Sequence, residues 1–249
     1  MDFQALSTAY TGTAARGYDA RRAPTTKWLG EDSAVGELLR VVPPGATVLD
    51  MPVGTGRFLK LYHKRGMKVV GRDISSDMLK AAREKLDEVE ELEELRGNGE
   101  TSWADCSLQL GDIRAIPDGD DTYDCALSSR FLNWVDARGL EDVLGELRRV
   151  SNRYLIVGIR HKVPAADLMF RGPDGLRRFA TGHLLGFRRF ARRLLRHPLG
   201  RAPHTIQHER DTVQHIFRKL GLRIDVRILV EHGRDGTDYY FYRLIKDAP

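Results

Sequence analysis

The segment from Thr47 to Asp73 has the pattern of a β-strand, a glycine-containing loop, a helix and a second β-strand. The first strand ends in the carboxylate of Asp50, the loop carries Gly54 and Gly56, and the second strand ends in Asp73. In a βαβ unit, such a loop lets the backbone approach a ligand closely, and an acid after the second strand is placed to bind ribose hydroxyls. The segment therefore predicts a site for a cofactor that contains a nucleoside.

The spacing fits the dinucleotide-binding pattern G-x-G-x-x-G only in part. Gly54 and Gly56 supply two glycines, and Asp73 follows Gly54 by nineteen residues, but Leu59 occupies the third glycine position. That glycine normally allows close packing of the helix on the strand. Asp50 also lies at the mouth of the loop, where its charge would repel a pyrophosphate. A ligand with a cationic head, such as S-adenosylmethionine, suits this carboxylate better.

The stretch LDMPVGTGRF resembles motif I of the class I S-adenosylmethionine-dependent methyltransferases, an acid followed by x-G-x-G-x-G. VVGRDISSDML is similar to the motif that follows it. LQLGDIRAIPDGDDTYDCALSSRFLNWV and RYLIVGIRH resemble later segments, so the similarity runs in order from Val41 to His161. Pro52 departs from the pattern, because it replaces the first loop glycine and has no N–H to donate.

The resemblance implies a role for each residue at the predicted strand ends. Asp50 would interact with the amino-acid end of the cofactor, and Asp73 would bind the ribose hydroxyls. Ile74 would lie against the adenine, Asp112 would accept a hydrogen bond from the adenine amino group, and Ile113 would pack on the ring. The full set of cofactor-binding residues that the resemblance implies is Tyr18, Asp50, Pro52, Gly54, Gly56, Asp73, Ile74, Asp112, Ile113 and Ser129.

The candidate catalytic residues are Arg130 and His161, which follow the fourth and fifth predicted strands. Ligands of parallel α/β sheets bind at the carboxyl ends of the strands, so both residues are expected at the rim of the site. A hydroxyl acceptor would need a base, for which histidine is the usual choice, whereas a carbon or amine acceptor would need none. An ordinary packing or solvated histidine is the alternative. Cys106 and Cys125 are too few for a four-ligand metal site, and no metal is expected.

Alternating apolar strands and amphipathic helices predict an α/β fold with a mostly parallel, doubly wound, seven-stranded sheet that ends in an antiparallel hairpin. The strands are expected at Thr47–Leu49, Lys68–Gly71, Leu108–Leu110, Tyr123–Ser128, Tyr154–Ile159, Arg223–Val230 and Tyr239–Leu244. Helices are expected at Glu31–Val42, after Ser75 or Ser76, at Gly139–Val150 and at Asp211–Leu220. One domain is expected, with an N-terminal arm (1–30), a cofactor-binding core (41–161), a basic helical insert (162–209) and the last helix and hairpin (210–249).

The insert is strongly basic. Between Arg160 and Arg223 there are fifteen Lys or Arg and four acids, which gives +11 for this segment against +5 for the whole chain. Apolar residues recur there at helical spacing, which predicts a lid of amphipathic helices. The arginines would be solvated, or residues 171–201 would contact an anionic membrane surface or the phosphates of an RNA.

The resemblance implies a methyltransferase, and the basic insert favours an anionic acceptor, which we expect to be a small molecule, a glycan or a lipid-linked group. An RNA-directed methyltransferase is one alternative, and a methyltransferase-like binding module with little turnover is another. The sequence shows no apolar run of membrane-spanning length and no apolar signal core near Met1. A cytoplasmic location is expected, with contact to a membrane surface through the insert as an option.

Overall fold

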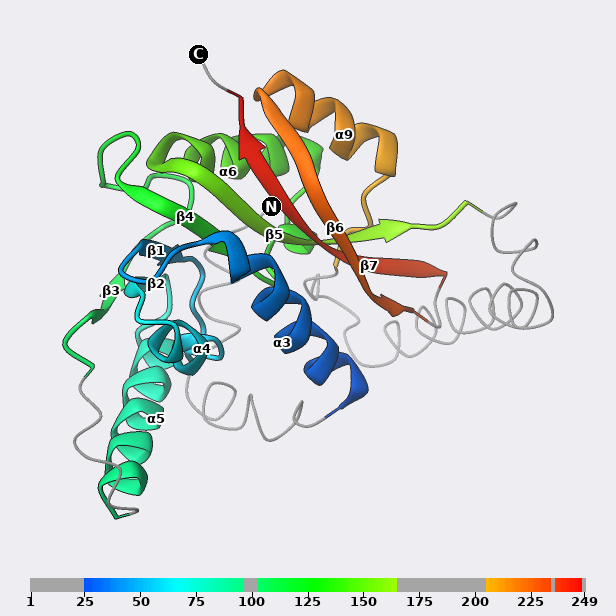
Figure 1. The fold of residues 1–249 in the computed structure, drawn as a ribbon. Coiled ribbons are helices and arrows are strands. Elements are labelled where there is room, and N and C mark those ends of the chain that lie inside the picture. The colour runs from blue at the N-terminus through cyan, green and yellow to red at the C-terminus, as the bar shows by residue number, and fades with distance from the viewer. Residues whose placement is uncertain (1–24, 96–102, 165–204, 234–235, 248–249) are drawn as a thin grey trace, which may run out of the picture.

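Seven strands form one sheet in the order β3-β2-β1-β4-β5-β7-β6 (Figure 1). The computed structural model describes residues 25–95, 103–164, 205–233 and 236–247. The strands are β1 (Thr47–Asp50), β2 (Lys68–Asp73), β3 (Cys106–Leu110), β4 (Tyr123–Ser128), β5 (Ser151–Lys162), β6 (Leu222–His232) and β7 (Thr237–Lys246). The helices are α3 (Thr26–Leu38), α4 (Leu59–Lys64), α5 (Ser76–Leu95), α6 (Ala137–Val150) and α9 (Arg210–Lys219), with the short 3-10 helices η1 (Leu39–Val41) and η2 (Leu132–Trp134).

Strands β1 to β5 run parallel to one another, and β7 runs antiparallel to both β5 and β6. The predicted α/β class and the terminal hairpin are therefore confirmed. Because right-handed crossovers connect parallel strands, their carboxyl ends meet at one edge of the sheet. Asp50 and Asp73 are the last residues of β1 and β2, so both acids reach this edge.

Helices cover both faces of the sheet (Figure 1). One core cluster joins α3, α4 and α5 to the sheet through residues such as Leu38, Leu59 and Leu79. The other cluster joins α6 and α9 to the opposite face through residues such as Leu144 and Val213. Each helix buries one apolar stripe, which is the pattern expected for helices packed on a sheet.

Helix α3 begins earlier than the predicted start at Glu31. The side chain of Thr25 caps it by accepting a hydrogen bond from the Trp28 N–H at 3.2 Å. Apolar residues do not recur at helical spacing in the first turn, so the sequence predicted a helix only from the start of the buried stripe. The cap at Thr25 sets the actual start. Five extra residues of helix result, and they include Lys27, which contacts Glu231 of β6, and Trp28, which contacts Arg57.

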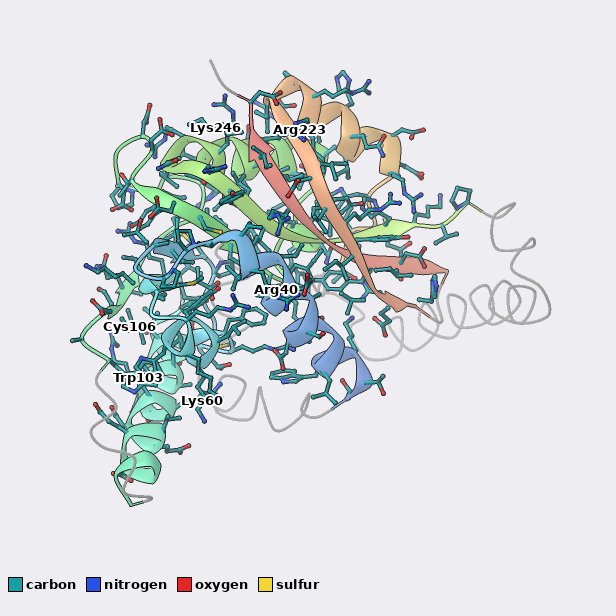
Figure 2. The ribbon with its side chains drawn as sticks, viewed as in Figure 1. Arg40, Lys60, Trp103, Cys106, Arg223 and Lys246 are labelled. Atoms are coloured by element: carbon teal, nitrogen blue, oxygen red, sulfur yellow. The ribbon has the colours of Figure 1, made fainter. Side chains whose placement is uncertain are left out.

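Strand β5 is also longer than its predicted range, because it pairs with β7 as far as Lys162 and Thr237. The β6–β7 hairpin has two distinct ends. At one end Leu222 pairs with Lys246, next to α9, and Figure 2 shows Arg223 and Lys246 there. At the other end His232 pairs with Asp238, beside the end of β5.

Two predictions fall outside the described residues. Tyr18 lies in residues 1–24, and most of the basic insert lies in residues 165–204. In the part of the chain that the structure does describe, no helix combines the length and apolar character needed to span a membrane. The same residues contain no cluster of three or more potential metal ligands.

Candidate functional site

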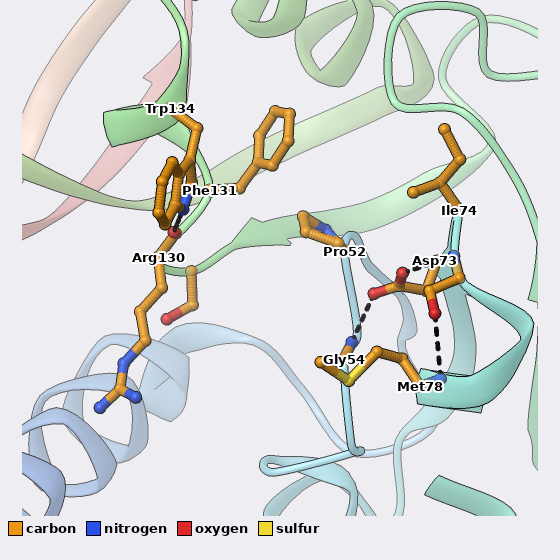
Figure 3. Close-up of a pocket in the computed structure, with 10 residues that line it drawn as sticks. Pro52, Gly54, Asp73, Ile74, Met78, Arg130, Phe131 and Trp134 are labelled. Carbon is orange, nitrogen blue, oxygen red and sulfur yellow. Dashed lines mark hydrogen bonds between the residues drawn. The ribbon is translucent and has the colours of Figure 1, made fainter. Parts of the chain in front are cut away.

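Two adjoining cavities open at the carboxyl ends of β1, β2 and β4. The larger, of about 610 Å³ with its open mouth, is drawn in Figure 3 and has Asp73, Ile74 and Trp134 in its wall. The smaller, of about 420 Å³, has Asp50 and Arg57 in its wall. Four residues line both cavities: Pro52, Gly54, Ser129 and Arg130. A ligand as large as a nucleoside with an amino-acid tail would span both cavities and cross these four residues.

The glycine loop between β1 and α4 forms the floor. Gly54 and Gly56 have φ values of +57° and +70°, in the left-handed region that glycine enters without steric cost. A Cβ at Gly56 would lie 2.5 Å from the Leu59 Cδ1, so a side chain there would also collide with α4. A Cβ at Gly54 would meet no heavy atom within 4 Å, so this residue borders open space.

Asp73 is fixed by the backbone around it. Its carboxylate accepts hydrogen bonds from the Gly54 N–H and the Ser75 N–H, each at 2.9 Å (Figure 3). Burial raises the pKa of this carboxyl, while the two N–H donors oppose that rise. Next to it, Ile74 is 40% exposed and lines the larger cavity. An oriented acid and an exposed apolar side chain thus lie side by side in the cavity wall.

Asp50 lies deeper, with 2% of its surface exposed. Its carboxylate accepts a hydrogen bond from the Tyr62 hydroxyl at 3.1 Å. Burial raises the pKa of Asp50 to about 8, and the nearby charge of Asp73 adds to the rise. Within the described part of the chain, no Lys or Arg forms an ion pair with Asp50. A cation that entered the smaller cavity would therefore favour the ionised form of Asp50 and pair with it.

Arg130 holds an unusual backbone conformation just after β4. Its φ of +59° is rare for a residue with a side chain. Its N–H donates to the Tyr239 hydroxyl at 3.3 Å, and its carbonyl accepts from the Trp134 Nε1 at 3.1 Å. These contacts from β7 and η2 hold the conformation, which is characteristic of functional sites.

A buried acid, Glu31, organises the wall between the cavities and α3. Its side chain is fully buried and forms ion pairs with both Arg57 and Arg130. The Arg57 guanidinium also stacks 3.7 Å from the centre of the Trp28 ring and binds Asp32 at 2.9 Å. The two arginines line the cavities, whereas Glu31 and Asp32 do not. The side of this cluster that faces the cavities is therefore cationic.

The sequence patterns did not identify Glu31 as a site residue, although a signal for it exists. Glu31 precedes Ala34, Val35 and Leu38 by three, four and seven residues, so the acid lies on the buried stripe of α3. A carboxylate in such a position requires charged partners. Its partners come from the glycine loop and from the end of β4, and helical periodicity alone does not reveal them.

The fold and the site agree with known proteins. A family model described as a methyltransferase domain matches residues 48–153. The chain carries a class I S-adenosylmethionine-dependent methyltransferase domain. S-adenosylmethionine is the cofactor of this family, and the expectation drawn from the loop motif is confirmed.

The curated relatives include malonyl-acyl-carrier-protein O-methyltransferases. Those from Pectobacterium atrosepticum and Erwinia pyrifoliae are 33% and 34% identical to the chain over 150 residues. Each alignment covers 59% of this chain and 49% or 47% of the relative. The chain thus spans about half the length of the curated relatives that it matches.

Solved structures of methyltransferases share the fold across nearly the whole chain. Magnesium protoporphyrin IX methyltransferase from Synechocystis PCC 6803, with bound SAH, gives a TM-score of 0.68 at 14% identity, covering 99% of this chain and 100% of that one. A chain in the complex of the Haloferax volcanii Trm112 methyltransferase activator with the putative methyltransferase gives 0.65 at 16% identity, with 98% of each covered. At these identities the likeness concerns the fold alone.

In this methyltransferase domain, His161 does not reach the cavities. Its side chain is 1% exposed, and its Nε2 lies 2.8 Å from the Tyr242 hydroxyl, on the face of the sheet that α9 covers. Burial lowers the pKa of His161 to about 4. Successive residues of a strand point to opposite faces, so a position at the end of β5 did not place the imidazole on the cavity side. The structure therefore gives His161 a packing environment, and the prediction of a base at this position needs correction.

Two further predicted residues also lie outside the cavity walls. Asp112 binds the Arg114 side chain, with the Arg114 Nε 3.0 Å from Oδ1, and this partner lowers the pKa of Asp112. Ile113 is 5% exposed and belongs to the apolar core. Contact of Asp112 and Ile113 with adenine stays a prediction. By contrast, the two cavities are lined by Asp50, Pro52, Gly54, Asp73, Ile74, Ser129 and Arg130, and the contact of these residues with a cofactor or acceptor stays a prediction.

Proposed function

We propose that the chain transfers the methyl group of S-adenosylmethionine to an anionic acceptor, and that a carboxylate oxygen receives it. The main support is the arrangement of charge at the cavities. Acids lie in the outer walls, and Arg130, whose side chain is 20% exposed, belongs to the set of residues common to both cavities. The printed names of the curated relatives, O-methyltransferases of malonyl-acyl-carrier protein, favour the same acceptor class.

The residues present fit the cofactor. Asp50 would neutralise the cationic amino-acid end, because its buried carboxylate has no cationic partner among the described residues. Gly54 would allow close approach, since the space beside it is open. Asp73 would bind the ribose hydroxyls with Ile74 against the base, and Pro52 and Ser129 would line the passage between the cavities.

Bound S-adenosylmethionine supplies a methyl group that its positive sulfur already activates. The chain must then hold the acceptor close to the methyl group and aligned with it. This proximity alone can lower the activation barrier by about 7–11 kcal/mol. Arg130 would bind the acceptor carboxylate, for which a planar guanidinium is well suited. A carboxylate is ionised at neutral pH, so its methylation needs no base. Among the described residues, the cavity walls contain no histidine, which agrees with a reaction that needs no base.

The carrier of the acceptor carboxylate is a separate part of the proposal. The relatives' names favour an acyl thioester on a carrier protein, and a free small molecule, a glycan or a lipid-linked acid would present the same group to Arg130. The RNA-directed alternative depends on residues 171–201, which lie outside the described residues.

Turnover with a defined acceptor tests the proposal. The chain would be incubated with S-adenosylmethionine and malonyl-acyl-carrier protein, and formation of both S-adenosylhomocysteine and the methyl ester would be followed by mass spectrometry. Malonamyl-acyl-carrier protein, whose terminal group is an amide, is the matched control. We expect product from the acid and none from the amide. Equal turnover of both acceptors would contradict a carboxylate acceptor, and binding of S-adenosylhomocysteine without turnover of any acid tested would favour a binding module.

A further inference from the structure

Beyond the cavities, two cations lie over the buried ring of Tyr239. The Lys27 Nζ lies 5.0 Å from the ring centroid and the Arg160 Cζ lies 5.5 Å from it. The backbone N–H of Arg130 contacts the ring's hydroxyl at 3.3 Å. We call Lys27, Arg160, Glu231 and Tyr239 the Tyr239 patch. It adjoins the point where the two cavities meet, because Arg130 belongs to both cavity walls.

The register of the hairpin builds the patch. Tyr239 of β7 is paired with Arg160 of β5 on one side and with Glu231 of β6 on the other. Residues paired across strands share a face of the sheet, so these three side chains form one row. The row lies on the face that α3 covers, and the first turn of α3 adds Lys27. Gly158 makes room for the ring, since a Cβ there would lie 2.2 Å from the Tyr239 hydroxyl.

The patch contains two cations and one anion. Glu231 binds the Lys27 Nζ at 2.7 Å and the Arg160 Nη2 at 3.4 Å, and Arg160 also donates to the Thr237 Oγ1 at 2.8 Å. Burial lowers the pKa of Lys27 despite its bond to Glu231. The side chains of Lys27 and Arg160 keep 27% and 17% of their surface exposed, so an anion can reach them. One carboxylate therefore leaves the patch with an excess positive charge beside the site.

We propose that Lys27 and Arg160 bind a second anionic group of the acceptor, one that is not methylated. This inference rests on the proposed function, in which Arg130 binds the first anionic group. The acceptor class would then be a dianion, such as a dicarboxylate or a carboxylate joined to a phosphate. Charge-assisted hydrogen bonds from both side chains would fix the acceptor at two points and so orient the carboxylate that Arg130 binds.

An NMR titration with malonate and acetate tests this subsite in protein saturated with S-adenosylhomocysteine. The two probes differ in the second carboxylate. We expect the wild-type chain to bind malonate at least about fivefold more tightly than acetate, since one charge-assisted hydrogen bond corresponds to roughly a tenfold change. Lys27→Gln should remove most of this preference. Arg223→Gln is the matched control, because this exposed arginine lies at the opposite end of the hairpin (Figure 2), and it should keep the preference.

Arg160 is more buried than Lys27, and a neutral residue at this position would risk destabilising β5. The second variant is therefore Arg160→Lys, which keeps the charge. An unchanged preference for malonate in Lys27→Gln would overturn the proposal, as would equal binding of malonate and acetate by the wild-type chain. Loss of the preference in Arg223→Gln would also overturn it, because the effect would then follow total charge. Failure to bind S-adenosylhomocysteine would instead defeat the proposed function, and the titration of the cofactor-free chain would still test the patch.

Discussion

The two halves of the sheet build their parts of the site in different ways. In the half formed by β3, β2, β1 and β4, one contiguous motif supplies the glycine loop and the acids, and backbone N–H groups hold Asp73 in place. In the half formed by β5, β7 and β6, side chains from four separate segments meet around Tyr239. The first half, which we propose as the cofactor half, depends on local backbone geometry. The second, which we propose as the acceptor half, depends on long-range ion pairs.

Asp73→Ala should produce the largest effect, because it removes an acid of the cofactor half. Loss of two charge-assisted hydrogen bonds to a ribose corresponds to about a hundredfold weaker binding or more, and the Gly54 N–H also loses its acceptor. Isothermal titration with S-adenosylhomocysteine measures the change. Asp87→Ala, an exposed acid on α5, is the control and should bind normally. Wild-type affinity in Asp73→Ala would remove the cofactor assignment.

Arg130 follows β4 of the cofactor half, yet Arg130→Gln should reduce turnover of the acceptor far more than binding of the cofactor. We expect kcat/KM for a carboxylate acceptor to fall by about a hundredfold, since a bidentate ion pair is lost. The affinity for S-adenosylhomocysteine should change by less than about threefold. Arg130→Lys, which keeps the charge but not the planar fork, should give an intermediate rate. Equal losses of cofactor affinity and turnover would show that the two halves are not separable at this residue.

Glu31→Gln tests the ion-pair cluster that joins the halves. Both guanidinium groups would then face a neutral amide in a buried position. Removing one partner of a buried ion pair costs about 3–5 kcal/mol of folding stability. Residual exposure of the Arg57 and Arg130 side chains, at 11% and 20%, reduces the expected loss to roughly 2–3 kcal/mol. Urea denaturation measures it. Glu37→Gln, an exposed acid of the same helix, should cost less than about 0.5 kcal/mol. Similar values for both variants would contradict a central role for Glu31.

Asp50→Asn should stabilise the cofactor-free chain, and more so at pH 8 than at pH 4. Folding raises the pKa of Asp50 from 3.8 to about 8. Its protonated form is therefore favoured in the folded state, and the resulting stability is lost as pH rises from about 4 to 8. Asparagine keeps the Tyr62 hydrogen bond and does not ionise. We expect a gain in Tm of at least about 2 °C at pH 8 and little gain at pH 4. A gain independent of pH would show that ionisation of Asp50 is not the cause.

His161→Ala should have the smallest effect on turnover. The imidazole extends from β5 over one face of the sheet and packs against Tyr240 and Tyr242 of β7, away from both cavity walls. We expect the chain to lose about 1–3 kcal/mol of stability, since a buried ring and one hydrogen bond disappear, while the rate per folded molecule changes by less than about twofold. Rates normalised to folded protein test this expectation, and a loss of a hundredfold would restore His161 as a base.

These contrasts explain how far the sequence alone could lead. The order of strands, the glycine loop and the acids Asp50 and Asp73 follow from contiguous patterns, because apolar periodicity and left-handed glycines act locally. The start of α3 was wrong by five residues, because a single cap at Thr25 decides it. Glu31 and the Tyr239 patch were missed because their partners lie in distant segments, and only the register of β5, β7 and β6 brings them together.

The direction of a side chain also limited the prediction. His161 and Arg160 are neighbours at the end of β5, and a shift of one residue exchanges the face that points toward α3 for the face that points toward α9. Arg160 faces Glu231 and Tyr239, and His161 faces the core. The sequence shows both at a strand end, and the pairing with Tyr239 and Asp238 decides which one points toward α3.

A crystal structure of the full chain with S-adenosylhomocysteine tests the central claim most directly. The account predicts ribose hydroxyls within hydrogen-bond distance of the Asp73 carboxylate, the amino group of the ligand beside Asp50, and the sulfur near Ser129 and Arg130, where the cavities join. A ligand bound elsewhere, or one from which both carboxylates point away, would contradict the assignment of this edge of the sheet as the site of methyl transfer.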